Sequence, residues 1–145
     1  MKRQLFLVLF ILTLSTIIHS CCKGCPDDYI SNLTFKNFTL TDLERLEITS
    51  YVKNSNFTTV IDSFYIDNKA QQSDEGIYIS LPTEMDIAYD WKIKVINIKT
   101  SYTITNFITE KKSCFSCGHN HTYSTVVSYK VNGITRLEHP IFIIK

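Results

Sequence analysis

Five cysteines and four histidines carry most of the reactive chemistry that this 145-residue chain could offer. Cys22 and Cys25 form one C-x-x-C pair, and Cys114 and Cys117 form a second pair far away in the sequence. Paired C-x-x-C motifs are a zinc-ribbon signature when the segment between them is short. Here that segment is long, which disfavours a zinc ribbon. If the protein is exported, as the pattern of residues 1–20 described below indicates, disulfides are favoured over a metal. Three connectivities remain open.

A redox-active role for either pair is disfavoured. Thioredoxin-like motifs place the first cysteine at the N-terminus of a helix, which lowers the pKa of its thiol. Neither pair here precedes a helical pattern. We therefore predict structural bonds rather than a thiol catalyst.

A second group of metal-type donors lies close together in the sequence. Cys114, Cys117, His119 and His121 supply four ligands suited to zinc within eight residues. The spacing is tight for one ion, and only a looped conformation is expected to bring the four groups together. We favour a polar loop between strands, pinned by a disulfide, with the metal site as the weaker alternative and no cofactor predicted.

The remaining side chains form no recognisable catalytic set. With only 4 glycines, the chain has no Gly-rich phosphate loop, and no nucleophile elbow is present. The sequence therefore leans against an enzyme and predicts no catalytic residue. Its aromatic residues, which include Trp91, could stack on sugar rings, but strands use aromatic residues for packing far more often.

Four Asn-x-Ser/Thr sequons are present, at Asn32, Asn37, Asn56 and Asn120. Roughly two would arise by chance in a chain of this composition. They keep open an alternative in which the protein is a secreted, disulfide-bonded glycoprotein of a eukaryotic host.

Residues 1–20 have the layout of a secretory signal peptide. Lys2 and Arg3 form a positive start, residues 5–14 are an apolar run interrupted only by Thr13, and Ser20 is a small residue at the end. A membrane-spanning helix needs about 20 apolar residues, and this run is shorter. We expect the segment to be removed after export.

The residues around the cleavage point resemble the lipobox of bacterial lipoproteins. Ile18 is a branched aliphatic residue, Ser20 is small, and Cys21 would be the first residue after cleavage. In that family the cysteine thiol receives a diacylglyceryl group, which carries fatty acids such as palmitate. The resemblance implies lipidation of Cys21 and leaves the other four cysteines as an even set.

Residues 21–29 would then form a short tether to the membrane. An acidic cluster in the first few residues after the lipidated cysteine would resemble the surface-export signal of lipoproteins of the Bacteroidota. Asp27 and Asp28 come later than that pattern requires. The expected location is therefore the cell envelope, anchored to the outer membrane, with periplasmic and surface orientations both open.

The part after residue 20 has the size and charge of one ordinary domain. Without Lys2 and Arg3, the 15 basic residues fall to 13, against 14 acidic residues. A chain with this charge balance lacks the excess of basic residues that is typical of nucleic-acid-binding proteins and of polybasic membrane-binding patches. The predicted partners are the lipid bilayer, through the anchor, and an unidentified protein or glycan, with no nucleic acid.

Residues 30–145 show no linker or repeat, so a single domain is predicted.

Most of residues 30–145 has the pattern of β-strands. Apolar residues alternate with polar ones over residues 46–52, as expected when one face of a sheet is buried. Residues 87–98 carry bulk on both faces, which is typical of an inner strand. Further strands are predicted at 57–66, 77–81 and 102–108.

The C-terminal part contains the clearest turn signal. Residues 122–131 and 134–144 flank Asn132-Gly133, a dipeptide that suits a type I′ hairpin turn. Thr41 and Glu44 have the spacing of a capping box, but only for one helical turn. The predicted fold is an all-β antiparallel sandwich of about seven or eight strands, with a small β-barrel as the alternative.

Taken over its whole length, the chain resembles the small lipoproteins of the Bacteroidota, a group without an agreed activity. The resemblance is carried by the start Cys21-Cys22-Lys23-Gly24-Cys25-Pro26, by Leu46-Glu47-Ile48-Thr49-Ser50 leading to Asp62-Ser63-Phe64-Tyr65-Ile66, and by the Asn-Gly hairpin. It implies a location and no mechanism. The expected function is a cell-envelope lipoprotein whose β-domain binds or scaffolds another component without catalysis.

Overall fold

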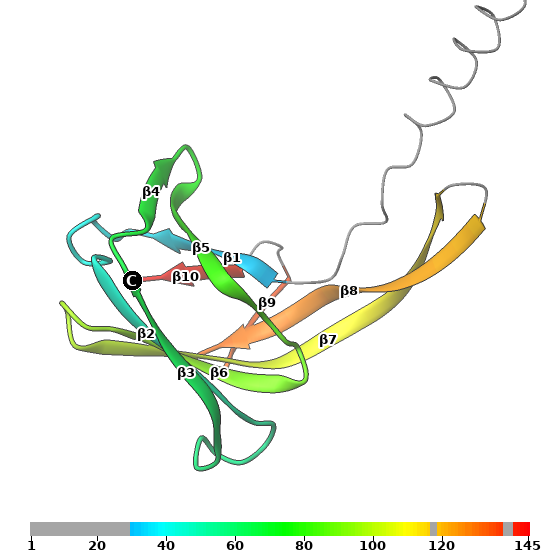
Figure 1. The fold of residues 1–145 in the computed structure, drawn as a ribbon, viewed down its shortest axis with the longest axis horizontal. Coiled ribbons are helices and arrows are strands. Elements are labelled where there is room, and N and C mark those ends of the chain that lie inside the picture. The colour runs from blue at the N-terminus through cyan, green and yellow to red at the C-terminus, as the bar shows by residue number, and fades with distance from the viewer. Residues whose placement is uncertain (1–29, 117–118, 138–140) are drawn as a thin grey trace, which may run out of the picture. The chain divides into compact units, whose positions relative to one another are not determined.

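The computed structural model describes residues 30–116, 119–137 and 141–145. These residues form ten strands and no helix: β1 (Ile30–Lys36), β2 (Arg45–Val52), β3 (Val60–Asp67), β4 (Ala70–Ser73), β5 (Gly76–Met85), β6 (Tyr89–Val95), β7 (Thr100–Ser116), β8 (His119–Val131), β9 (Ile134–Arg136) and β10 (Ile141–Ile144). One sheet has the order β10-β1-β5-β4 and the other β3-β2-β6-β7-β8-β9. The two sheets pack together (Figure 1), which confirms the predicted β-sandwich, with more strands than expected.

The described chain divides into two compact units. One comprises residues 28–110 and 125–145 and contains the sandwich. The described part of the other consists of residues 111–116 and 119–124. The predicted boundaries at residues 20 and 29, and with them the signal peptide and the tether, lie outside the described residues.

The core of the sandwich forms from the alternating strands. Leu46 and Ile48 on β2 are fully buried, and so are Ile93 and Val95 on β6, while Trp91 is 5% exposed. Burial of each such side chain stabilises the fold by about 1.5–3 kcal/mol. β6 lies between β2 and β7, so the prediction that residues 87–98 hold an inner strand is confirmed.

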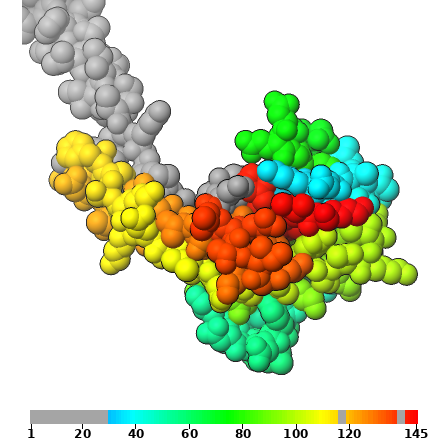
Figure 2. Space-filling view, turned by 180° about the vertical axis from the view of Figure 1, so that it is seen from behind, coloured from blue at the N-terminus to red at the C-terminus, as the bar shows by residue number. Residues whose placement is uncertain are grey.

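The predicted strand over residues 134–144 is wrong, because this segment contributes to both sheets. β9 pairs with β8, whereas β10 pairs in parallel with β1 in the other sheet, and Figure 2 shows β10 (red) beside β1 (cyan). The sequence between them contains Pro140, which has no N–H for a sheet ladder and restricts the residue before it. This restriction is a physical reason for the break.

The turn at Asn132-Gly133 is confirmed. Both residues have positive φ, 49° and 79°, and Val131 faces Ile134 across the hairpin. The Asn132 side chain has a role that the sequence did not predict, because its Oδ1 accepts a hydrogen bond from the Thr103 N–H at 2.8 Å. The Asn132 N–H donates to the Thr103 carbonyl at 2.9 Å, so the turn is also fixed to β7.

β5 continues past the residue where the sequence pattern predicted its end. Its ladder with β1 shifts register between the pairs Asn32–Ser80 and Ile30–Met85, and Pro82 lies within this irregularity. Proline is tolerated at such bulges because no ladder hydrogen bond depends on its missing N–H. Pro82 therefore does not end the strand.

The short turn expected from the spacing of Thr41 and Glu44 is present, but the reciprocal side-chain pair that caps it lies two residues earlier. The Thr39 N–H donates to Asp42 Oδ2 at 2.9 Å, and the Asp42 N–H donates to Thr39 Oγ1 at 3.1 Å. Between Glu44 N and Thr41 O there is only a backbone contact of 3.5 Å. Two side-chain oxygens thus satisfy the first free N–H groups of the turn.

Candidate functional site

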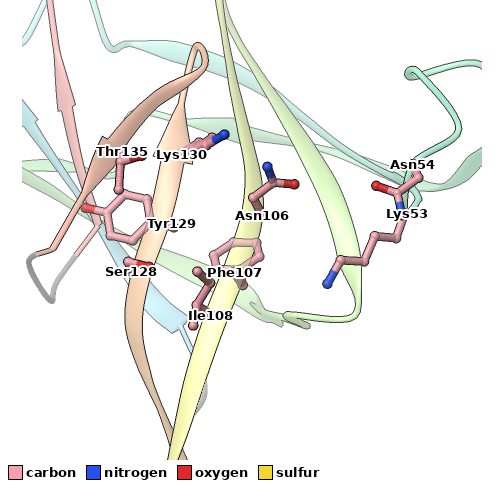
Figure 3. A pocket seen from close by; sticks show the side chains of 9 residues that line it. All are labelled: Lys53, Asn54, Asn106, Phe107, Ile108, Ser128, Tyr129, Lys130 and Thr135. Atoms are coloured by element: carbon pink, nitrogen blue, oxygen red, sulfur yellow. The ribbon is translucent and has the colours of Figure 1, made fainter.

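A pocket of about 390 Å³ lies in the sandwich unit, beside the paired strands β7 and β8. This volume lies within the range of about 300–1,000 Å³ that is usual for small-molecule sites. This is the β7–β8 pocket, and Figure 3 shows the side chains that line it: Lys53, Asn54, Asn106, Phe107, Ile108, Ser128, Tyr129, Lys130 and Thr135.

An irregularity in β7 creates the floor of the pocket. Pairing between β6 and β7 extends from Val95–Thr100 only to Trp91–Ile104. Tyr102 and Ile104 are buried, and the next buried side chain is Phe107, three residues further along. Between them, Asn106 has a φ of 53°. This change of alternation is what a β-bulge produces, and it opens the sheet where β7 leaves β6.

The hydrogen-bonding side chains of β8 and β9 lie on the outer face of the six-stranded sheet. Tyr129 points inward, because its hydroxyl accepts a hydrogen bond from the Phe142 N–H in the other sheet at 2.9 Å. Ser128 and Lys130 flank Tyr129 in the strand and therefore project to the opposite side. Thr135 is the direct partner of Lys130 across the hairpin. The pocket lining thus combines Tyr129 and Phe107, which are buried, with Lys130 and Thr135, which project to the outer face; Ser128 is only 6% exposed.

The turn between β2 and β3 forms the opposite wall. Asp90, on β6, is only 6% exposed, and its Oδ2 accepts a hydrogen bond from the Asn54 N–H at 2.9 Å. Asn54, Asn56 and Phe57 all have positive φ, at 62°, 51° and 59°. A bulky residue such as Phe57 is uncommon in this region, and its ring packs edge-on against Tyr51 at 5.2 Å. These contacts fix the turn that presents Lys53 and Asn54.

Two ammonium groups give the pocket a positive character. Figure 3 shows Lys53 extending from the β2–β3 turn on one side of Asn106, and Lys130 extending from β8 on the other side. Neither lysine is among the residues that form ion pairs in the described chain. The pocket lining contains no carboxylate. This arrangement can attract an anion and can hydrogen-bond hydroxyl or carbonyl oxygens.

The predicted loop over residues 114–121 is wrong, because β7 continues to Ser116 and β8 begins at His119. His119 and His121 are exposed strand residues, and positions two apart in a strand project to the same face. The strand therefore does not separate the two imidazoles, contrary to the expectation that only a loop would bring them together. No group of three or more metal-type side chains forms among the described residues.

The cysteine predictions rest mainly on residues outside the described chain. Cys114 is partly buried near the end of β7 and has an interaction partner. Cys21, Cys22, Cys25 and Cys117 lie outside the described residues. Lipidation and the disulfide pairing therefore stay predictions.

All four sequon asparagines are exposed. Asn32 lies on β1 and Asn120 on β8, while Asn37 and Asn56 adopt positive φ of 65° and 51°. Each is therefore positioned where a glycan could be attached without disrupting the core.

Sequence reasoning missed the β7–β8 pocket entirely. The available signal was Asn106, where the alternation set by Tyr102 and Ile104 breaks before Phe107. An Asn that interrupts a strand pattern is a candidate for a left-handed bulge residue. Lys53 and Lys130 carry no such signal, because they lie on segments far apart in the sequence.

Comparison with protein families, curated proteins and solved structures returned no match for this chain. Within the part of the chain that the structure describes, no helix is both long and apolar enough to cross a membrane.

Proposed function

We propose that the protein is a lipid-anchored lipoprotein of the bacterial cell envelope whose β-sandwich binds another envelope component. The observation that carries the binding role is the β7–β8 pocket, which combines two ammonium groups, two amides and two hydroxyls above an apolar floor. A few convergent polar groups on a partly apolar surface are the usual composition of a ligand site. The lipid anchor at Cys21 would hold this pocket at the membrane.

The anchor is tested by the processing of Cys21 in the full-length chain. We expect globomycin, which blocks the lipoprotein signal peptidase, to cause the precursor to accumulate. We also expect the mature N-terminal peptide to gain the mass of a diacylglyceryl group, and the variant Cys21→Ser to lose both effects. An unmodified Cys21 in the mature protein would refute the lipoprotein proposal.

A second candidate is a secreted, disulfide-bonded glycoprotein, which the exposure of all four sequon asparagines favours. Protein isolated from its natural host is the appropriate sample. A mobility shift after removal of N-linked glycans, together with a mass change at Asn32 or Asn56, would replace the lipoprotein proposal with this one.

A third candidate is a small metal-binding protein that uses the segment from Cys114 to His121. The observation in its favour is that His119 and His121 are both exposed on β8 and share a face. Elemental analysis of the purified protein tests it. Stoichiometric zinc that is lost from a His119→Asn, His121→Asn double variant would support it, whereas a metal-free protein excludes it.

A further inference from the structure

We infer that the β7–β8 pocket takes a small hydroxylated anion, in which a carboxylate or phosphate group contacts the two lysines and hydroxyl groups contact the amides. An acidic sugar has this chemistry. The inference rests on the proposed binding function and adds the class of ligand to it. It does not depend on how the protein is attached to the membrane.

The positive charge of the pocket lining favours a negatively charged ligand. Lys53 and Lys130 come from opposite walls of the pocket, with Asn106 between them (Figure 3), and neither takes part in a described ion pair. Lysines are mostly exposed at protein surfaces, so one lysine alone would not indicate a site. Two lysines in the lining of one pocket, with no carboxylate in that lining, provide an anion subsite.

The nearby carboxylate of Asp90 forms a hydrogen bond with the β2–β3 turn, which is one wall of the pocket. Its Oδ2 accepts the hydrogen bond from the Asn54 N–H, and Asp90 does not line the pocket. The Asp90 Oδ1 is buried and has no hydrogen-bond partner in the described chain. Asp90 is therefore a positioning residue, which fixes the turn that presents Lys53.

The uncharged lining groups select a ligand that also carries hydroxyls. The amides of Asn54 and Asn106 each offer donors and an acceptor, and the hydroxyls of Ser128 and Thr135 can do both. Asn106 is held by a left-handed bulge, with a φ of 53°, and bulges commonly re-aim a side chain next to a functional site. Phe107 is largely buried and, with Ile108, supplies the apolar part of the lining.

The test uses the purified full-length protein in detergent and isothermal titration calorimetry with four probes. Potassium glucuronate and glucose 6-phosphate carry the two candidate anionic groups, glucose is the neutral control, and glucosamine is the cationic control. We expect at least one anionic probe to bind about tenfold or more tightly than glucose, and this affinity to fall as salt is added. A preference between the two anions identifies the source of the charge.

Matched variants assign the effect to the pocket. Lys53→Met and Lys130→Met are each expected to weaken the anionic probe about tenfold, whereas Lys69→Met, which removes the same charge from an exposed position away from the pocket, should not. Asn106→Gly keeps a backbone that accepts positive φ and removes the amide, so it should weaken binding without lowering the melting temperature. Thermal melts confirm that each variant is folded.

Three outcomes would overturn the inference: equal binding of glucose and the anions, an equal loss in Lys69→Met, or no binding of any probe. These outcomes leave the processing of Cys21 unaffected. Conversely, an unmodified Cys21 would refute the lipid anchor and leave a measured anion preference intact. Failure of one proposal is therefore distinguishable from failure of the other.

Discussion

Asparagine, rather than glycine, makes most of the tight turns in this molecule. Eight non-glycine residues in the described chain have positive φ, and the six asparagines among them are Asn37, Asn54, Asn56, Asn68, Asn106 and Asn132. The left-handed region is unfavourable for residues with a Cβ, and Asn tolerates it because its short polar side chain can bond locally. With only 4 glycines in the chain, asparagine fixes both the hairpin turn and the bulge at the pocket.

The first prediction concerns Gly133, which has a φ of 79° and no neighbouring atom within 4 Å of the position of an added Cβ. Gly133→Val should therefore destabilise the protein through backbone strain alone, by about 1 kcal/mol or more. The melting temperature should fall by several degrees. Gly133→Asn is the control, because Asn accepts positive φ, and it should melt close to the parent. Equal melting of the valine variant and the parent would contradict the turn assignment.

The second prediction concerns the pH dependence that Asp42 confers. The hydrogen bond from the Thr39 backbone N–H and the contact with the Lys145 ammonium at 3.0 Å lower the pKa of the Asp42 carboxyl. A lowered pKa in the folded state stabilises the protein above the ordinary Asp pKa of about 3.9. That stabilisation is lost as the pH falls through the folded-state pKa. Asp42→Asn should therefore be less stable than the parent at neutral pH.

Urea unfolding at neutral pH and at about pH 2.5 measures this difference, which should shrink in acid because the carboxylate of the parent becomes protonated as the pH falls through its lowered folded-state pKa. Asp74→Asn, at an exposed turn position, is the control and should follow the parent at both pH values. A stability difference for Asp42→Asn that stays constant across this pH range would show that the carboxylate charge is not what stabilises the turn.

At the scale of the elements, β8 and β10 connect the two sheets. Tyr129 on β8 is 1% exposed, and its hydroxyl accepts the N–H of Phe142 on β10. β10 is the edge strand of its sheet and pairs only with β1 in the described chain. The edge strand β10 has no second neighbour strand in the described chain to accept the Phe142 N–H. The Tyr129 hydroxyl, from the opposite sheet, accepts it instead.

The third prediction follows from this hydrogen bond. Tyr129→Phe leaves the buried N–H of Phe142 without this acceptor, which should cost about 1–3 kcal/mol. Chemical denaturation monitored by circular dichroism measures the change. The control is Tyr65→Phe, because Tyr65 is 53% exposed and keeps the ring that faces the Arg45 guanidinium. Equal stability of Tyr129→Phe and the parent would mean that the hydroxyl contributes nothing to the link between sheets.

The elements that could be predicted from the sequence were those with regular alternation. The pattern of β2 predicted a half-buried strand, that of β6 predicted an inner strand, and the Asn132-Gly133 turn follows from local backbone chemistry. The register shift around Pro82 could not be predicted, because it depends on which strand lies alongside. The bulge at Asn106 had a single local signal, an Asn within a strand pattern, which does not show which strand the bulge faces. For the same reason, the transfer of residues 141–144 to the other sheet was missed. The pocket is lined by Asn106 and Phe107 at the bulge, so it was missed with the bulge.

At the scale of the whole molecule, strands from both ends of the described chain lie side by side. β1 and β10 pair in parallel from Leu33–Ile141 to Lys36–Ile144, and the Lys145 N–H then donates to the Lys36 carbonyl at 3.1 Å. Pairs so distant in sequence contribute little until the chain is largely ordered, because loop closure costs entropy first. A cross-link between distant parts of the chain would lower that cost.

The last prediction is that Cys22, Cys25, Cys114 and Cys117 form two disulfides in the exported protein. If Cys21 is lipidated, the remaining cysteines are even in number and can all pair. The cell envelope is also an oxidising compartment, in which disulfides persist. Thiol titration of the denatured, unreduced protein should therefore find none of the four reactive. Four reactive thiols, or stoichiometric zinc released by a chelator, would contradict it.

The stability lost on reduction identifies the pairing. A bond from the tether to the Cys114–Cys117 segment closes a loop of about 90 residues, and the chain-entropy model assigns it roughly 4–5 kcal/mol as an upper expectation. Bonds within each C-x-x-C pair close loops of only a few residues and constrain the unfolded chain far less. A Cys22→Ser, Cys25→Ser double variant that loses as much stability as the fully reduced protein indicates cross-pairing. Near-parent stability of that variant indicates that each pair closes on itself.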